Sequence, residues 1–226
     1  MTAELLVRCS GAARTYGNGA AATVALRPTD CEVAAGGRIA LVGPSGSGKS
    51  TLLHLMAGLD RPTIGTVEWP ALGPLAALRP GPVGVVFQGP SLLPPLTVLE
   101  NVAFPLVLGG ETDARARERA RDALARLDLR ALADKLPDEL SGGQAQRAAV
   151  ARALAGEPRL LLADEPTGQL DHVNAATVVD VLLAAAGHAG AALVVATHDP
   201  AVAGRLDERW EIHSGALSLP TGTVTA

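Results

Sequence analysis

The sequence predicts an α/β fold in which a mostly parallel sheet carries helices on both faces. Short apolar runs of strand length alternate with segments of helical character along the chain. The chain has 226 residues, which suits one large domain or one domain with a smaller subdomain. Hydrophobic residues make up 48% of it, mostly Ala, Leu and Val, so the chain can bury a sizeable core.

The first third of the chain predicts short strands, a glycine-rich loop and a helix. The runs ELLVRC and CEV are β-like, and the turn at 34–37 leads into a buried strand over 38–42. A glycine-rich loop follows over 43–48, and the apolar run over 51–59 is typical of a helix. Prolines and glycines then indicate a loop over 69–84.

The rest of the chain alternates helices with apolar strands. A strand is predicted over 83–87, helices over 97–136 with a charged one near 113–131, and another helix over 141–156. Short buried strands are predicted last, at 159–163 and 192–197. Ligands on such sheets bind beyond the carboxyl ends of the strands, so the residues after each strand are the candidate site.

One apolar stretch, residues 178–196, approaches the length of a membrane span. It contains Asp180, which a spanning helix would bury at a large free-energy cost. A helix, a glycine-bounded turn and a short strand explain the same residues without that cost. We therefore expect no span, and the charged N-terminus predicts no export signal.

Charge and cysteine content narrow the class of protein further. The net charge is −4 and the pI is about 5.7, so there is no electrostatic reason to bind nucleic acid. Cys9 and Cys31 lie far apart in the sequence and match no metal-binding spacing. We expect both to be buried free thiols in a reducing cytoplasm, not a disulfide.

The glycine-rich loop matches a phosphate-binding pattern. Residues 43–51, GPSGSGKST, fit G-x-x-x-x-G-K-[ST], between an apolar strand and an apolar helix. Lys49 would bridge the β- and γ-phosphates of a nucleotide, and the Ser50 hydroxyl would bind Mg²⁺. Lys49 is one of only two lysines beside seventeen arginines, and a compact ammonium fits such a loop better than a guanidinium fork. The expected phosphate-binding residues are Gly43, Ser45, Gly46, Gly48, Lys49, Ser50 and Thr51.

An acidic pair and a histidine follow two of the predicted strands. At the carboxyl end of a strand, Asp164 can hold Mg²⁺, and Glu165 can orient or deprotonate an attacking water. The ordinary alternative is an acidic helix cap followed by Pro166. His198 follows the next apolar strand, where it can donate a hydrogen bond to a γ-phosphate.

A second glycine-rich helix start, LSGGQ, occupies residues 140–144. Ser141 and Gln144 fit a capping box, so one interpretation is simply the start of a helix. A cap needs no glycines, however, and Gly142 and Gly143 would let an anion approach the backbone closely. One nucleotide cannot easily use both this segment and the phosphate loop of a compact monomer. In a two-fold dimer, each LSGGQ would close on the nucleotide of the other copy.

Taken together, these motifs resemble the ATPases of ABC transporters. The resemblance is carried by GPSGSGKST, Gln88 in VVFQ, LSGGQ, LLLADEP, the Leu-Asp pair at 170–171 and His198, in the family's order over residues 14–199. It implies a P-loop NTPase of RecA-like fold with an N-terminal antiparallel β-subdomain and a helical subdomain.

The resemblance also implies domain limits within a single ABC ATPase domain, residues 1–226. Residues 1–88 and 157–226 would form the nucleotide-binding core together with its β-subdomain, and residues 89–156 would form the helical subdomain.

Residue roles follow from the same resemblance. Tyr16, the only tyrosine, resembles the aromatic residue that stacks on adenine, and Gln88 resembles the residue that touches Mg²⁺ and water. Asp171 resembles the residue that reaches across the dimer. The implied catalytic residues are Lys49, Gln88, Glu165 and His198, with Glu165 as the base. The implied nucleotide contacts from the other copy are Ser141, Gly142, Gly143 and Gln144. The implied metal ligands are Ser50, Gln88 and Asp164.

The activity implied is ATP hydrolysis with Mg²⁺, with two ATP molecules held between two copies of the chain. The implied partners are transmembrane permease subunits, not nucleic acid, and the chain would lie at the cytoplasmic face of the membrane through them. Segments 58–67, 86–106 and 163–168 are most similar to the lipoprotein-release, macrolide-export and cell-division branch. Ala145 and Gln169 depart from that branch without altering a phosphate ligand.

Apolar residues and prolines are concentrated at 89–106. If exposed, they would form a groove for a helix of the membrane partner; otherwise they form the core of the helical subdomain. The residues concerned are Leu92, Leu93, Pro94, Pro95, Leu96, Val98 and Pro105.

Two other functions stay open at this stage. A soluble ABC ATPase of DNA repair or translation would usually carry a coiled coil, a zinc module or a second cassette. Here only 51 residues separate Gln88 from Leu140. A small-molecule kinase or GTPase with the same loop would leave LSGGQ without a role, and the guanine motif N-K-x-D is absent.

Overall fold

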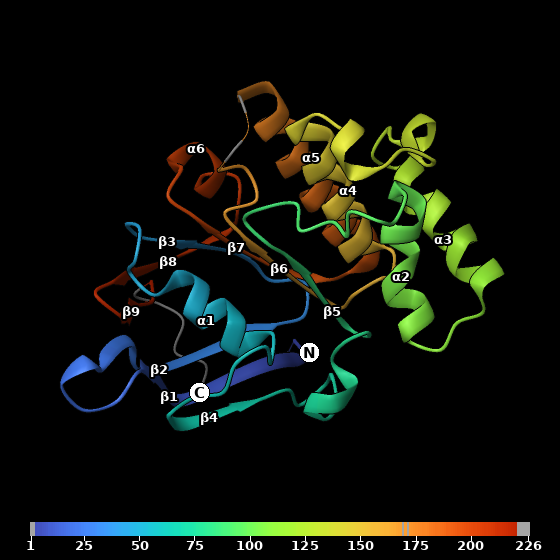
Figure 1. Cartoon of the computed structure of the whole chain (residues 1–226). Coiled ribbons are helices and arrows are strands. Elements are labelled where there is room, and N and C mark those ends of the chain that lie inside the picture. Colours follow the sequence, from blue (N-terminus) through green and yellow to red (C-terminus); the bar gives the residue numbers. More distant parts are fainter. Residues whose placement is uncertain (1–2, 169, 171, 221–226) are drawn as a thin grey trace.

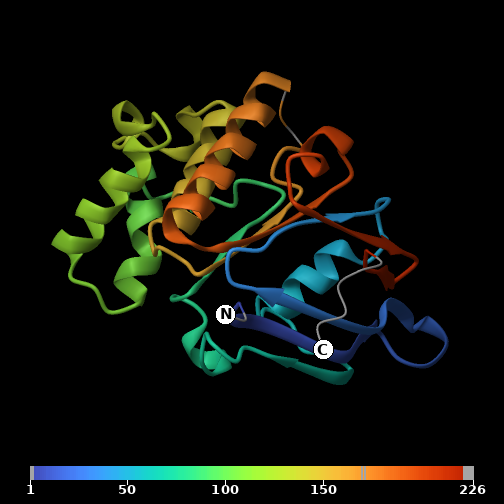
Figure 2. The same cartoon turned by 180° about the vertical axis from the view of Figure 1, so that it is seen from behind.

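The computed structural model describes residues 3–168, 170 and 172–220. The chain forms two sheets, with helix α1 (Lys49–Met56) lying between them (Figure 1). The other α-helices lie on the far side of the larger sheet, most of them grouped at one end of the molecule (Figure 2).

The larger sheet has six strands in the order β5-β6-β7-β3-β8-β9. The first five run parallel, and β9 is antiparallel to β8, so the predicted mostly parallel α/β fold is confirmed. The strands are β3 (Arg38–Val42), β5 (Val83–Val86), β6 (Leu160–Asp164), β7 (Ala192–Thr197), β8 (Glu208–His213) and β9 (Ala216–Ser218). Parallel strands end at the same edge, so the segments that follow β3, β5, β6 and β7 meet there.

The smaller sheet is antiparallel and has the order β2-β1-β4. Its strands are β1 (Leu5–Tyr16), β2 (Thr23–Ala34) and β4 (Ile64–Glu68). Cys9 on β1 lies directly opposite Cys31 on β2, and both are buried free thiols, as expected. Two residues that are distant in the sequence are therefore cross-strand neighbours.

Alternation along β6 separates the two large hydrophobic clusters of the interior. Leu160 and Leu162 pack with α1 and the smaller sheet, whereas Leu161 and Ala163 pack with the helices on the opposite face. Successive side chains of a strand point to opposite faces of the sheet. The continuous apolar run that predicted this strand is therefore explained by burial on both sides.

The helices of the far face are α2 (Val98–Leu108), α3 (Asp113–Ala125), α4 (Gly142–Leu154), α5 (His172–Ala189) and α6 (Pro200–Ala203). The 3₁₀ turns are η1 (Gly19–Ala21), η2 (Leu75–Ala77), η3 (Arg130–Leu132) and η4 (Pro137–Glu139). Capping boxes start α2, with Thr97 and Glu100, and α4, with Ser141 and Gln144. Within the described part of the chain, no helix combines the length and apolar character needed to cross a bilayer.

The sequence patterns did not predict strands β4, β8 and β9, and they predicted only parts of β1 and β2. Strand β4 is mostly exposed, and β8 alternates charged residues with the buried Trp210 and Ile212, so neither contains an apolar run. Only parts of β1 and β2 are predicted, because β-bulges interrupt their pairing and blur the alternation. Helix α3 ends at Ala125, before the predicted limit near 131, and the 3₁₀ turn η3 follows.

Candidate functional site

The loop after β3 is shaped by glycines that a side chain could replace only with a collision. A Cβ at Gly43 would lie 2.2 Å from the carbonyl oxygen of Ile212, and one at Gly48 would lie 2.4 Å from that of Ala25. Gly46 and Gly48 have φ of +74° and +112°, a region that other residues rarely adopt. The loop is thus closely packed on its inner side and ends where α1 begins.

Lys49 occupies the first helical position of α1, and its side chain is buried. Nζ donates to the carbonyl oxygens of Gly43 at 2.8 Å and Pro44 at 3.1 Å. Nζ also lies 3.3 Å from Oε1 of Glu165. The ammonium is therefore held over the loop, beside a carboxylate from the end of β6. The other predicted loop ligands Ser45, Gly46 and Ser50 are exposed, whereas Thr51 is buried.

Glu165 follows β6 and lies between two partners. Its φ of +43° is unusual for a residue with a side chain, and backbone strain of this kind concentrates at functional sites. Oε1 faces Lys49, while Oε2 lies 2.9 Å from Nδ1 of His198 and 3.4 Å from its backbone nitrogen. The Glu165 side chain is 11% exposed and the ring of His198 is 66% exposed. A carboxylate held in this way can orient or deprotonate a water molecule.

Asp164 ends β6 and provides an oxygen without a partner. It is 7% exposed, and its Oδ1 is buried with no hydrogen bond among the described residues. A buried carboxylate oxygen is costly unless a donor or a cation completes it. The described residues hold no cluster of three His, Cys, Asp or Glu side chains that could bind a metal alone. The oxygens of Asp164 and Ser50 do fit Mg²⁺, which proteins hold with one or two side chains plus substrate phosphates.

Tyr16 ends β1 and is 40% exposed. The Arg14 guanidinium lies 4.6 Å from the ring centroid, and the Tyr16 hydroxyl and Arg14 Nε each donate to Oδ2 of Asp60 at 2.9 Å. Burial raises the pKa of Asp60. Hydrogen bonds from the Arg61 backbone, Tyr16 and Arg14 outweigh that effect and hold the pKa below its usual value. Sequence reasoning missed Arg14 and Asp60, which lie 46 residues apart and share no local pattern.

The LSGGQ segment begins α4 with the expected capping box. Ser141 Oγ accepts from the Gln144 backbone at 3.3 Å, and Gln144 Oε1 accepts from the Ser141 backbone at 2.9 Å. Among the described residues, no hydrogen bond or ion pair joins residues 140–144 to the loop over 43–51. Helices α1 and α4 lie on opposite sides of the larger sheet (Figure 1). The two glycine-rich helix starts are therefore not joined within one chain.

Two predicted site residues stand apart from these contacts. Gln88 lies two residues beyond β5, with its side chain exposed and, in the described part of the chain, without a hydrogen bond or ion pair. Asp171 lies outside the described residues.

A cavity of about 630 Å³ opens between β5, the end of α2 and α4. Its apolar lining includes Phe87, Leu93, Phe104 and Leu108, and the last of these is 64% exposed. Leu93 and Pro105 of the expected groove do line this cavity, but Val98 is 1% exposed and belongs to the core. The exposed groove and the buried core are thus both present in the segment 89–106.

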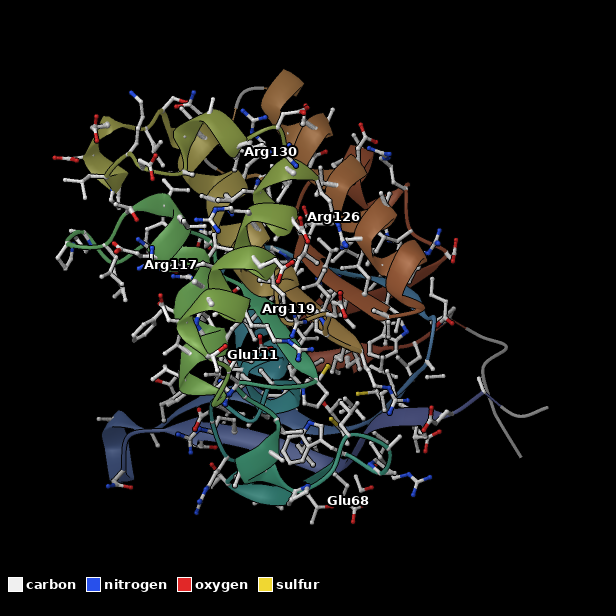
Figure 3. The ribbon with its side chains drawn as sticks, turned by 90° about the vertical axis from the view of Figure 1, so that its right-hand side faces the viewer. Glu68, Glu111, Arg117, Arg119, Arg126 and Arg130 are labelled. Atoms are coloured by element: carbon white, nitrogen blue, oxygen red, sulfur yellow. The ribbon has the colours of Figure 1, made fainter. Side chains whose placement is uncertain are left out.

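The polar lining of this cavity is mostly basic. Arg119 pairs with Glu111, and the two side chains lie next to each other in Figure 3. Arg152 donates to the carbonyl and hydroxyl oxygens of Ser91 at 2.8 and 2.7 Å, and burial lowers its pKa. The cavity therefore combines apolar side chains with a guanidinium that has only neutral partners among the described residues.

Comparison with known families agrees with this geometry. Residues 26–168 match the ABC transporter family. The chain belongs to that family and is the ATP-binding, ATP-hydrolysing subunit of an ABC transporter.

Individual relatives narrow the comparison. The lipoprotein-releasing system ATP-binding protein LolD of Chromohalobacter salexigens is 40% identical over 222 residues, covering 95% of this chain and 94% of the relative. LolD of Gluconobacter oxydans is 43% identical over 223 residues, covering 96% of each chain. A dimeric ATP-binding cassette solved in a post-hydrolysis state with ADP and Pi is 35% identical with a TM-score of 0.85. That match covers 96% of this chain and 100% of the other. None of these relatives favours a role in DNA repair or translation.

Proposed function

We propose that this chain is the ATPase of a lipoprotein-releasing membrane complex, in which two copies drive transmembrane permease subunits. The names of the LolD relatives support this class of complex. The observation that carries the proposal is the Glu165 carboxylate held between Lys49 and His198 at the carboxyl edge of a parallel sheet.

ATP would bind with its phosphates on the loop over 43–51 and its base at Tyr16. Lys49 would neutralise charge on the β- and γ-phosphates, and its contact with a phosphate would free Oε1 of Glu165. Glu165 would then take a proton from the attacking water. His198, when its ring is protonated on both nitrogens, would donate from Nδ1 to the carboxylate and from Nε2 to the γ-phosphate. A positioned base of this kind contributes a rate factor of about 10²–10⁴.

Asp164, Ser50 and Gln88 are the residues that would hold Mg²⁺. When bound, the ion neutralises charge that develops on the phosphates. The unpartnered Oδ1 of Asp164 supports this assignment. Gln88, exposed after β5, would reach the ion from the carboxyl edge of the sheet.

A second copy would complete each ATP site. The start of α4 carries a partial positive charge, and a Cβ at Gly142 would meet no atom within 4 Å, so the helix start is open to an approaching phosphate. Contacts from the other copy would come from Ser141, Gly142, Gly143 and Gln144, and Asp171 would reach across the dimer. The dimeric relative supports this arrangement.

The cavity beside α2 would receive a helix of the permease subunit. It lies against residues 89–156, the proposed helical subdomain, and residues 1–88 and 157–226 would form the core. Phe104 and Leu108 offer exposed apolar surface, and a helix covering Arg152 would need to supply an acceptor such as a carboxylate. Docked in this way, the chain would be peripheral at the cytoplasmic face of the membrane.

Co-expression with the permease subunits of a lipoprotein-releasing complex tests the proposal. Leu108→Asp should keep the ATPase activity of the isolated chain but abolish co-purification with the permease and permease-stimulated turnover. Val107→Asp is the matched control, because Val107 is also exposed on α2 but does not line the cavity. Wild-type chain that hydrolyses ATP yet neither binds the permease nor supports lipoprotein release would reject the proposal.

A further inference from the structure

Tyr16 is fixed by side chains from two separate segments. Its hydroxyl donates to Oδ2 of Asp60 at 2.9 Å, and the same oxygen accepts from Nε of Arg14 at 2.9 Å. The Arg14 guanidinium also stands over the aromatic ring, 4.6 Å from its centroid. A half-exposed tyrosine would otherwise sample several rotamers, so these contacts restrict the ring to one orientation.

The loop that carries Asp60 is itself attached at both ends. The backbone nitrogen of Asp60 donates to the His54 carbonyl of α1 at 3.3 Å. At the other end, Thr63 donates to the Ala13 carbonyl at 2.7 Å, and the Thr15 backbone donates to the Thr63 hydroxyl at 3.1 Å. The end of β1 is therefore tied to the end of α1, and the start of α1 is the phosphate loop.

This connection sets the position of the ring relative to the phosphate loop. Helix α1 has 8 residues, a rigid segment of about 12 Å. Because Arg14 covers one face of the Tyr16 ring, a planar base can stack only on the opposite face. Asp60 thus fixes the position of the aromatic ring, and Arg14, which Asp60 also holds, determines which face of the ring is open.

We propose that Arg14 and Asp60 are positioning residues for nucleotide binding, which hold Tyr16 in the orientation that stacks on the base. This inference rests on the proposed function, in which Tyr16 is the adenine contact. Asp60 acts through the Tyr16 hydroxyl and Arg14 through the ring, and neither touches the phosphates. Their loss weakens binding of the base and leaves binding of the phosphates unchanged.

Calorimetric titration with ADP, and displacement of a fluorescent ADP analogue by pyrophosphate, separate the two parts of the ligand. Asp60→Ala should weaken ADP binding about fivefold, the effect of losing one hydrogen-bonded contact, and leave pyrophosphate affinity unchanged. The same variant should raise KM for ATP with kcat unchanged. Asp60→Asn, which still accepts a hydrogen bond, should recover most of the ADP affinity.

Arg61→Ala is the matched control. Arg61 is exposed and adjacent, and its backbone donates to Oδ1 of Asp60 at 2.7 Å regardless of its side chain. This variant should bind ADP like the wild type. Tyr16→Phe keeps the ring but lacks the hydroxyl, so it should match Asp60→Ala without the risk of a backbone rearrangement.

The double variant Tyr16→Ala with Asp60→Ala decides whether Asp60 acts through the ring. Tyr16→Ala alone should bind ADP at least tenfold more weakly, which is about the contribution of an aromatic–base stack. Adding Asp60→Ala should then cost nothing further. Additive losses, or equal losses for ADP and pyrophosphate, would overturn the positioning role.

The outcomes also distinguish this inference from the proposed function. If Tyr16→Ala binds ADP like the wild type, the base does not stack on Tyr16 and the proposed function is wrong at that residue. If Tyr16→Ala weakens ADP binding while Asp60→Ala and Tyr16→Phe do not, the adenine contact is supported and only the positioning role is refuted.

Discussion

The chain contains two glycine-rich helix starts, and the structure completes them differently. At the start of α1, a Cβ at Gly43 or Gly48 would collide with backbone carbonyl oxygens, and Lys49 is buried beside Glu165. At the start of α4, a Cβ at Gly142 would meet nothing within 4 Å. There Ser141 hydrogen-bonds only with residues of its own segment among those described.

Under the proposed function, this difference separates a site that one chain completes from a site that needs two chains. The loop before α1 is packed and charged by its own chain, so in the proposed function it would hold phosphates without a second copy. At the start of α4, the capping box engages the backbone N–H groups of Ser141 and Gln144, and the outer side of the helix start is open at Gly142. It therefore suits a ligand carried by another molecule, as the proposed dimer requires.

The largest expected effect is on ATP turnover and comes from Glu165, whose carboxylate lies beside Lys49 of the phosphate loop. Glu165→Gln should lower ATP turnover by about 10²–10⁴-fold, because the amide cannot accept the proton of the attacking water. ATP binding should persist, and a dimer with trapped ATP should accumulate, as measured by size-exclusion chromatography. Wild-type turnover in this variant would remove Glu165 from the role of base.

The second effect separates capping from phosphate binding at Ser141. Aspartate is an equally good N-cap, so Ser141→Asp should leave stability unchanged, but its charge would repel a γ-phosphate from the other copy. We expect turnover to fall about 100-fold, the usual loss when one stabilising contact to the reacting group is removed. ADP binding to the monomer should not change.

Thr97→Asp provides the control, because Thr97 forms the same capping box at the start of α2. It should leave turnover unchanged. Equal activity of Ser141→Asp and wild type would mean that LSGGQ only starts a helix.

The smallest effect tests the caps themselves. Ser141→Ala and Thr97→Ala each remove a side chain that accepts a backbone hydrogen bond at a helix start. Each should lower the free energy of unfolding by about 1 kcal/mol, measured by urea denaturation. If Ser141→Ala costs nothing while Thr97→Ala does, then the Ser141 cap is not a stabilising contact in solution.

Much of the fold was predictable because its central strands are buried on both faces. The runs over 38–42 and 192–197 match β3 and β7 residue for residue. The edge elements were not predictable in the same way. Strand β4 is exposed and β8 is charged on alternate positions, so their pairing with neighbours, and not their own composition, makes them strands.

The site divides along the same line. The phosphate loop and the LSGGQ cap are local patterns whose hydrogen bonds close within a few residues, and the acidic pair directly follows a buried strand, so all three could be recognised in the sequence. The sequence predicted roles for Lys49, Glu165 and His198 but not the contacts between them. No local spacing specifies those contacts. Arg14 and Asp60 were not predicted as site residues, because neither belongs to a local sequence pattern and only folding brings them together.

By itself, therefore, the sequence determined the elements that a few neighbouring residues specify: the turning glycines, the lysine in the loop, the helix caps and the buried strands. Only the tertiary structure decided that Cys9 faces Cys31 and that the P-loop lysine meets a carboxylate two strands away in the sheet. It alone decided that Asp60 holds Tyr16. Strand order and register arise from packing between distant segments, and no local period in the sequence encodes that packing.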